Sequence, residues 1–375
     1  VLIFYFFSKI KWFRLCTLSL IIASFIFYTH WDHSLIVILI FSILFNYTIS
    51  FFIQPSNPGA KKLLIAGLSV NLLLLIYFKY RNFLLGNLLP LFSASYTPAS
   101  LHLPLGISFY TFTQIAYLVD VHQKKTKPHS LTDYILFVSF FPHLIAGPIV
   151  HYSHVMPQFE SLKKKLIHYE NLFKGVFYFI LGLSQKVLFA NYLDPIANEG
   201  FHNAAALSTL AAWKAVLAYS FQIYFDFAGY SCMAIGLALL FNIRFPDNFN
   251  SPYQASSMID FWRRWHMTLS EFLRNYVYIP LGGNRKGTVR QHLNIFLTML
   301  IGGIWHGASW TFVFWGCYHG VLLMANHMLD KTRFCIPKSA ARISTFLLVT
   351  FGWVFFKSET FAQAAAMFKA LLGMN

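Results

Sequence analysis

Long stretches of the chain carry no charged side chain. No Asp, Glu, Lys or Arg occurs in residues 33–60, 82–119, 134–159 or 291–329, and further uncharged runs are shorter. A helix that crosses a bilayer needs about 20 predominantly apolar residues, a length that these runs meet or approach repeatedly. The pattern therefore predicts an all-α, polytopic membrane protein with about nine to eleven spanning or re-entrant helices.

Two of the uncharged runs contain residues that start or break helices. Pro104 and Gly106 precede an apolar segment and predict that a helix starts there. Pro142, Gly147 and Pro148 interrupt the next uncharged run. Irregular backbone at membrane depth is tolerated only where protein or a water-filled cavity satisfies the freed backbone groups. The interruptions therefore predict non-helical segments within the membrane domain.

Residues 244–290 differ from the rest because they mix charged and aromatic side chains. Within residues 259–275 the apolar positions recur at helical spacing, which predicts an amphipathic helix that lies in the membrane interface or dips into it. These positions are Phe261, Trp262, Trp265, Leu269, Phe272 and Leu273. A surface anchor would explain the aromatic and basic side chains, but it does not explain His266.

Composition and charge support a membrane protein. Hydrophobic residues make up 57% of the chain and charged residues 11%, whereas a soluble domain carries about 25% charged residues. The net charge is +16, which on a soluble domain would suggest nucleic acid. Here the basic residues cluster between apolar segments, as at Lys124, Lys125 and Lys127, where they keep loops on the cytoplasmic side. We therefore expect a lipid bilayer and no nucleic acid as partner.

The chain shows no internal repeat and no low-complexity segment, so we expect a single membrane domain over residues 1–375. Its four cysteines (Cys16, Cys232, Cys317 and Cys335) are scattered and form no C-x-x-C pair, so neither a metal site nor a disulfide framework is indicated. The sequence begins at Val1 without Met or a basic n-region. This start argues against a cleaved signal peptide and predicts further residues upstream.

Several signatures of soluble enzymes are absent from the sequence, among them G-x-S-x-G, H-E-x-x-H and the P-loop Gly-Lys. A His-x-x-x-Asp pattern, which marks some acyltransferases, occurs at His129 and Asp133. Ser130 and Asp133 also have the spacing of a helix capping box directly before an apolar run. Structural capping is the better interpretation of this pattern.

A stronger candidate for chemistry is His306, which lies in the sequence GGIWHG within the uncharged run 291–329. An ionisable side chain at membrane depth is costly and is a functional candidate by default. The preceding glycines, Gly302 and Gly303, allow either a close backbone approach or a break in the helix beside a cavity. Packing is the competing interpretation, and the same run also contains other histidines, among which composition does not choose: His292, His319 and His327.

Four sequence blocks resemble the membrane-bound O-acyltransferase family. They are FWRRWHMTLS (261–270), YIPLGGNR (278–285), TMLIGGIWHGASW (298–310) and WGCYHG (315–320). Further similar blocks lie upstream, so the resemblance covers about residues 60–357. The combination of RRWH and WHG is highly specific. The YIPLGGNR block is more similar to the alginate and polysaccharide O-acetyltransferase branch than to the teichoic-acid D-alanylation branch.

The resemblance implies a role for each histidine. The catalytic histidine of the family corresponds to His306, and its second signature histidine corresponds to His266, which would line a tunnel through the helices or orient a group there. Arg263 and Arg264 would attract an anionic donor such as the phosphates of coenzyme A, or would only anchor the chain at the interface. Cys232 stands where the branch is expected to carry Asp, and so does Asn275.

The expected function is acetyl transfer from a cytoplasmic thioester towards hydroxyl groups of an exported cell-surface polysaccharide. The resemblance implies acetyl-CoA as donor with no bound cofactor or metal, a bacterial cytoplasmic (inner) membrane and a periplasmic acetyltransferase partner. It also implies further spans after Asn375. D-Alanyl transfer to teichoic acid is an alternative within the class. A membrane transporter is an alternative from another class, although many transporters contain an internal repeat, which this chain lacks.

Overall fold

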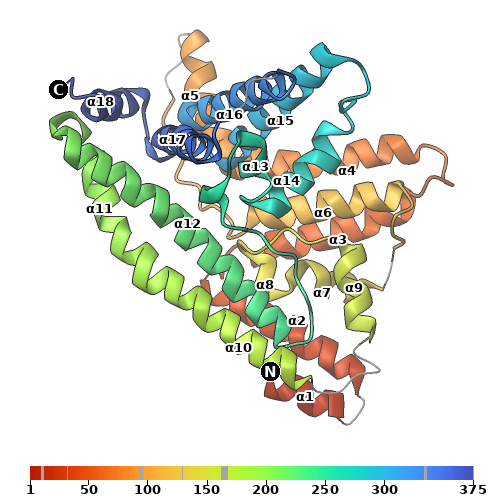
Figure 1. Cartoon of the computed structure of the whole chain (residues 1–375). Coiled ribbons are helices and arrows are strands. Elements are labelled where there is room, and N and C mark those ends of the chain that lie inside the picture. The colour runs from red at the N-terminus through yellow and green to blue at the C-terminus, as the bar shows by residue number, and fades with distance from the viewer. Residues whose placement is uncertain are drawn as a thin grey trace. The chain divides into compact units, whose positions relative to one another are not determined.

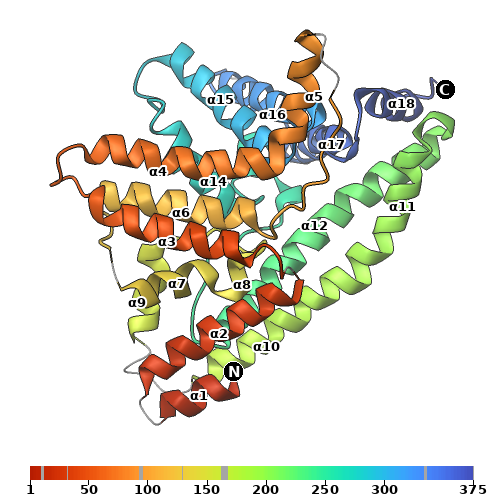
Figure 2. The ribbon, with the colours of Figure 1, turned by 180° about the vertical axis from the view of Figure 1, so that it is seen from behind.

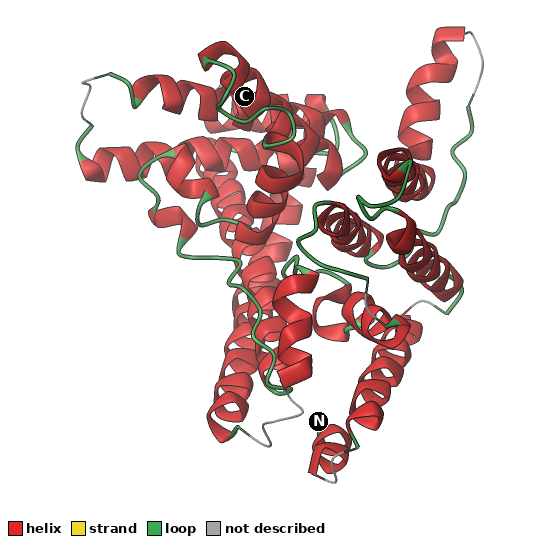
Figure 3. Cartoon of the chain, turned by 90° about the vertical axis from the view of Figure 1, so that its right-hand side faces the viewer, coloured by secondary structure: helices red, strands yellow, loops and turns green. Residues whose placement is uncertain are grey.

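The computed structural model describes residues 1–9, 12–31, 33–92, 96–128, 130–161, 168–332 and 336–374. These residues form helices, turns and loops, with no strand among them (Figure 3). The predicted all-α class is therefore confirmed. The chain separates into two compact units, residues 1–180 with 231–246 and residues 181–230 with 247–375. A single domain over the whole chain stays a prediction.

The first unit contains the N-terminal helices (Figure 1). Its elements are α1 (Leu2–Lys9), α2 (Phe13–Trp31), α3 (Ile36–Phe52), α4 (Ala60–Leu75), the π-helical turn η1 (Ile76–Tyr80), α5 (Arg81–Leu88), the 3₁₀ turn η2 (Leu89–Phe92), α6 (Ile107–His122), α7 (Leu131–Ser139), α8 (Phe141–Leu144), α9 (Tyr152–Ser161) and most of α10 (Tyr169–Ser184). Helix α6 starts directly after Gly106, as predicted. The predicted interruption near Pro142 is also confirmed, because α7 ends at Ser139 and only one short helix follows it.

Buried polar side chains join three apolar helices of the first unit. Helices α3, α4 and α6 pack side by side (Figure 2). The amides of Asn46 on α3 and Asn71 on α4 donate to each other at 3.1 and 2.7 Å. Gln114 on α6 donates to the hydroxyl of Ser42 on α3 at 2.7 Å. In an apolar environment such hydrogen bonds fix which helices pair, because an unpaired amide there is costly.

The second unit contains the remaining helices. Its elements are the end of α10, the π-helical turn η3 (Gln185–Ala190), α11 (Asn191–His202), the 3₁₀ turn η4 (Ala204–Ala206), most of α12 (Thr209–Leu239), the 3₁₀ turn η5 (Pro252–Gln254), α13 (Met258–Trp262), α14 (Met267–Leu273), the π-helical turn η6 (Arg274–Tyr278), α15 (Thr288–His306), α16 (Trp310–Leu329), α17 (Lys338–Lys357) and α18 (Phe361–Leu371).

Four continuous helical stretches of the described chain are long and apolar enough to cross a membrane. They are Phe13–Trp31, Ala60–Phe92, Tyr169–His202 and Lys338–Lys357, and the shorter Ile36–Phe52 is also apolar. The expected multi-pass membrane character is confirmed. The number of nine to eleven segments, which includes re-entrant ones, stays a prediction, as does the tunnel.

Helices α15, α16 and α17 run antiparallel to their neighbours (Figure 1). A Cβ added to Gly303 on α15 would lie 2.7 Å from the Cα of Gly316 on α16. Glycine on both helices therefore permits this close crossing. For the GGIWHG glycines the sequence predicted either a close backbone approach or a break in the helix. The close backbone approach is confirmed at Gly303. Helix α15 continues without a break to His306.

Candidate active site

The segment predicted as one amphipathic helix, residues 259–275, consists of two short helices, α13 and α14. The predicted apolar face is correct, because all six of its residues are buried. The prediction of one continuous helix was wrong. The Asn248 backbone carbonyl accepts a hydrogen bond from the Met267 N–H at 3.0 Å, and the Asn250 N–H donates to the Arg264 carbonyl at 2.9 Å. These bonds to the preceding loop replace bonds that a continuous helix would make.

His266 lies at this break, and its backbone adopts the left-handed conformation with φ 43°. Its side chain is 1% exposed, and its ring centroid is 4.6 Å from that of Phe227. The Asn248 side-chain carbonyl accepts hydrogen bonds from the Thr268 N–H and hydroxyl, so Nδ1 of His266, 3.1 Å from the same oxygen, must be the donor. In a neutral imidazole this tautomer leaves Nε2 as the acceptor.

His306 is the last residue of α15 and is partly buried among aromatic rings. Its ring centroid lies 4.9 Å from that of Trp305, 5.1 Å from that of Trp315 and 5.1 Å from that of Phe356. The Trp305 ring is also 6.4 Å from the ring of His266. The structure therefore brings the two histidines predicted from the sequence to the same tryptophan ring, although 39 residues lie between them in the sequence.

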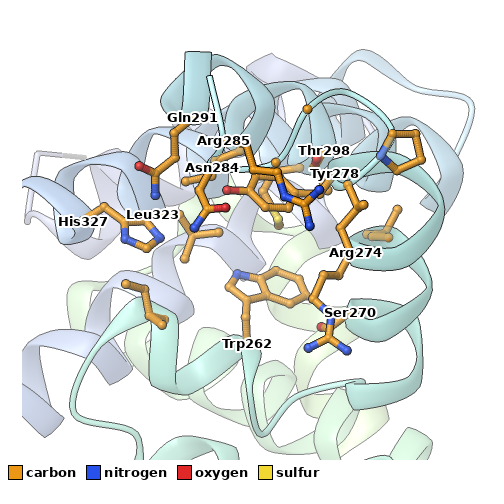
Figure 4. Close-up of a pocket in the computed structure, with 18 of the residues that line it drawn as sticks. Trp262, Ser270, Arg274, Tyr278, Asn284, Arg285, Gln291, Thr298, Leu323 and His327 are labelled. Atoms are coloured by element: carbon orange, nitrogen blue, oxygen red, sulfur yellow. The ribbon is translucent and has the colours of Figure 1, made fainter. Parts of the chain in front are cut away.

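A cavity of about 810 Å³ lies beside α13 and α14. We call it the cationic cavity and define it by Trp262, Arg263, Arg274, Arg285 and Lys286. Figure 4 shows Trp262 on its floor, with Arg274 and His327 on opposite sides. Other lining residues are Ser270, Tyr278, Asn284, Gln291, Thr298, Leu323 and His327. The volume of this cavity and its combination of polar and apolar lining residues are typical of a site for a small molecule or a ligand of cofactor size.

The cationic cavity has a strong excess of positive charge. Four of its lining side chains are Arg or Lys, and no Asp or Glu is among the described residues that line it. Arg263, Arg285 and Lys286 have no ion-pair partner in the described part of the chain, and the Arg274–Glu271 pair is long at 3.8 Å. Guanidinium and ammonium groups in such a concave site attract anions and suit phosphate in particular.

The two arginines predicted as donor-binding residues are placed differently. Arg263 lines the cationic cavity. Arg264 does not line it, because its Nε lies 2.7 Å from Oδ1 of Asp260, four residues earlier. The Arg264 side chain therefore ties the end of α13 to its own first turn.

Neither His306 nor His266 lines the cationic cavity. Trp262, on the cavity floor, has its ring centroid 5.8 Å from that of Trp315, and Trp315 contacts His306. Two tryptophan rings therefore separate the cavity from His306. A ligand anchored by the cations would have to displace or pass Trp262 for its reactive end to reach that imidazole.

The other histidines of the uncharged run occupy different surroundings. His319 is completely buried between α16 and α17, where a Cβ on Gly352 would lie 2.8 Å from its Nε2. Gly352 therefore packs directly against the His319 ring, and both ring nitrogens are buried without a hydrogen-bond partner among the described residues. His327 lines the cationic cavity, where it adds a further polar group. The catalytic assignment of His306 and His266 stays a prediction.

The sequence analysis did not single out Arg274, Arg285 and Lys286 as site residues. The signal that could have identified Arg285, and Lys286 directly after it, is the YIPLGGNR block, whose glycines turn the chain back over the cavity. Gly282 and Gly283 have φ values of 114° and 54°, which favour glycine. Arg274 begins the π-helical turn η6, and sequence periodicity does not reveal such turns.

The capping interpretation of the His-x-x-x-Asp pattern is confirmed on the described residues. The Ser130 hydroxyl accepts a hydrogen bond from the Asp133 N–H at 3.2 Å at the start of α7. His129 lies outside the described residues.

The apolar helices of the described residues are those of a multi-pass membrane protein. The sequence model of the membrane-bound O-acyltransferase family matches residues 23–358. The chain belongs to the membrane-bound O-acyltransferase family, and it is an acyltransferase and a multi-pass membrane protein.

Two similar proteins match nearly the whole chain. It is 43% identical to a peptidoglycan O-acetyltransferase of Helicobacter pylori, over 96% of this chain and 74% of the relative. It is 40% identical to a probable alginate O-acetylase of Pseudomonas aeruginosa, over 96% of this chain and 71% of the relative. A teichoic acid D-alanyltransferase of Streptococcus thermophilus is 28% identical over 59% of this chain. The O-acetyltransferase branch is therefore more similar than the D-alanylation branch.

Proposed function

We propose that the protein transfers an acetyl group from a cytoplasmic thioester, with acetyl-CoA as the donor, towards hydroxyl groups of an exported cell-surface glycan. The relatives with which it shares most identity are O-acetyltransferases of peptidoglycan and alginate. The observation that carries the donor assignment is the cationic cavity, whose four basic side chains suit the phosphates of a nucleotide-bearing thioester. The enzyme acts in the bacterial inner membrane, and a periplasmic acetyltransferase completes the transfer.

His306 acts as general base in this proposal. The imidazole takes the proton from an acceptor hydroxyl while that oxygen attacks the thioester carbonyl. The new C–O bond forms, the C–S bond breaks, and the proton returns to the leaving thiolate. Histidine suits this role because its ordinary pKa lies near neutrality. His266 acts as a positioning residue, since its ring faces Trp305 beside His306 and its Nδ1 is held by Asn248.

Replacing His306 by Ala tests the proposal. The loss of one general base typically lowers the rate by about 10²–10⁴-fold, whereas the loss of a packing side chain lowers mainly the amount of folded protein. We expect normal amounts of monodisperse H306A protein in detergent, with acetyl transfer from radiolabelled acetyl-CoA near background. Near-normal transfer per folded molecule would show that His306 is not the base.

D-Alanyl transfer remains the second candidate within the family. The acyl donor of that reaction is a thioester on a carrier protein. An assay that compares the two donors therefore separates the two functions. We expect free acetyl-CoA to support transfer by the purified protein, and D-alanyl-loaded carrier protein not to.

A further inference from the structure

Three buried aromatic side chains of the second unit carry polar atoms without a partner. Trp262, Trp315 and His319 are in mutual ring contact, with centroids 5.8, 5.3 and 4.7 Å apart. Nε1 of each indole and both ring nitrogens of His319 are buried and make no hydrogen bond within the described residues. We call these three side chains the unpaired cluster. The packing of the unit therefore leaves several hydrogen-bonding groups unused at one place.

Other tryptophans of the same unit do find partners. Trp353 stacks on Trp315 with ring centroids 6.0 Å apart, and its N–H donates to the Tyr253 hydroxyl at 3.1 Å. The Trp213 N–H donates to the Leu371 carbonyl at 3.2 Å. Leaving a buried donor unpaired is costly, and nearly all buried polar groups in proteins have a partner. The unpaired cluster therefore indicates groups that bind a ligand.

The chemistry of the unpaired cluster favours a ligand that brings hydrogen-bond acceptors. An indole N–H only donates, and a neutral imidazole has one donor and one acceptor, so donors exceed acceptors here. Carbonyl oxygens are the corresponding acceptors of a thioester such as acetyl-CoA. The position also suits that ligand, since Trp262 lines the cationic cavity and Trp315 contacts His306 at 5.1 Å between ring centroids.

Within the cluster, Trp315 contacts the proposed base, and the planes of the two rings lie edge to face at 87°. A carbonyl group that is attacked by an oxygen deprotonated by His306 must lie beside this imidazole, and hence beside Trp315. We propose that the Trp315 N–H donates a hydrogen bond to the thioester carbonyl oxygen and stabilises the negative charge that develops there. This inference rests on the proposed acetyl transfer, to which it adds a second catalytic residue.

The indole keeps its proton throughout the step. As the acceptor oxygen attacks, the C–O bond forms and an electron pair moves onto the carbonyl oxygen, where the Trp315 N–H stabilises it. The pair returns as the C–S bond breaks, and His306 passes the proton of the acceptor to the leaving thiolate. A hydrogen bond that strengthens only in the transition state raises the maximal rate and leaves the KM for the donor unchanged.

Trp315→Phe tests the proposal, because it removes the N–H and keeps an aromatic ring. The matched control is Trp353→Phe, which makes the same change at a tryptophan that is equally buried, at 1% exposed, and whose N–H is paired with Tyr253. Purified protein in detergent is assayed with acetyl-CoA and hydroxylamine, a small acceptor that needs no binding site, and the rate without protein is subtracted. The melting temperature of each variant is measured in the same detergent.

We expect Trp315→Phe to lower the maximal rate per folded molecule about 10²–10³-fold, the loss typical of one oxyanion donor, with the KM for acetyl-CoA unchanged. Trp353→Phe should keep a rate close to that of the wild type. It should nevertheless melt at the lower temperature of the two, because only this variant gives up a hydrogen bond.

A rate close to wild type in Trp315→Phe would overturn the assignment and leave the proposed acetyl transfer intact. Equal losses of rate in the two variants would also overturn it, since lost packing would then explain both. If Trp315→Phe does not fold, benzothienylalanine at the same position replaces the N–H by sulfur with nearly the same ring shape, and the same loss of rate is expected. A wild-type protein that transfers nothing to hydroxylamine would instead refute the proposed function.

Discussion

At the scale of single residues, neighbouring side chains of the RRWH block have separate tasks. Arg263 points its charge into a cavity without an acidic partner among the described residues, whereas Arg264 is bound to Asp260. His266 is turned into the interior by its left-handed backbone. One short motif therefore supplies a cation to the proposed donor site, an ion pair that stabilises α13 and a buried imidazole.

The two arginines should respond differently to the same substitution. Arg263→Gln removes a cation from the proposed phosphate site, so we expect the KM for acetyl-CoA to rise about tenfold, in line with the ~1.5–3 kcal/mol typical of a hydrogen bond to a charged group. Arg264→Gln leaves the cavity lining unchanged, so the KM of this variant for acetyl-CoA should stay within about twofold of the wild-type value. The measurement is the dependence of transfer to hydroxylamine on acetyl-CoA concentration. Equal KM values for the two variants would reduce Arg263 to an interfacial anchor.

At the scale of helices, the position of His306 depends on how closely α15 and α16 approach. A Cβ on Gly303 would lie 2.5 Å from the Phe312 carbonyl oxygen, which belongs to the backbone and cannot turn away. The adjacent Gly302 faces a different neighbour, and a Cβ there would meet only a Leu273 methyl group at 3.2 Å. Since His306 is one turn further along α15, a shift of this crossing moves the imidazole.

Alanine at these two glycines provides a matched pair. Gly303→Ala should lower the thermal stability of the protein in detergent, because overpacking at a fixed contact costs about 1–3 kcal/mol, and it should also reduce acetyl transfer per folded molecule. Gly302→Ala should be mild in both measurements, because a leucine side chain can rotate. If the two variants melted at the same temperature, the close crossing would not be what holds His306 in place.

At the scale of the whole molecule, the second unit has two chemically different ends. By the positive-inside tendency, we expect the end with Arg285, Lys286 and Arg290 to face the cytoplasm. The other end, where α15 ends at His306 and α17 ends at Lys357, carries Asn203 and the carboxylates of Glu199 and Glu359. This polarity matches a reaction in which a cytoplasmic donor meets an exported acceptor.

Labelling from each side of the membrane tests this orientation. In a variant whose four native cysteines are replaced by Ser, single cysteines are introduced at Lys286 and Asn203. We expect a membrane-impermeant maleimide to label Asn203→Cys in spheroplasts, and Lys286→Cys only after the membrane is permeabilised. The reverse pattern would place the cationic cavity on the outer face and exclude a cytoplasmic donor there. Labelling of both cysteines in sealed spheroplasts would show that the two positions do not lie on opposite sides of the membrane.

The sequence by itself determined the class of fold and the candidate imidazoles. Uncharged runs indicate burial in lipid, because charge at membrane depth is costly. The distribution of charged residues along the chain was therefore enough to predict a multi-pass helical protein. His306 and His266 followed from motifs whose residues are contiguous. The apolar face of residues 259–275 also followed, because side chains at helical spacing share one side whether or not the helix is continuous.

Only the tertiary structure decided how these pieces combine. The break at His266 depends on hydrogen bonds that Asn248 accepts, 18 positions away in the sequence, and local periodicity contains no information about them. The separation of Arg263 from Arg264 depends on which side chain finds Asp260. The cationic cavity is lined by residues from α13, α14, α15 and α16 together with the turn between α14 and α15. Spacing along a sequence predicts the face of a helix, whereas a cavity forms only when several such faces meet.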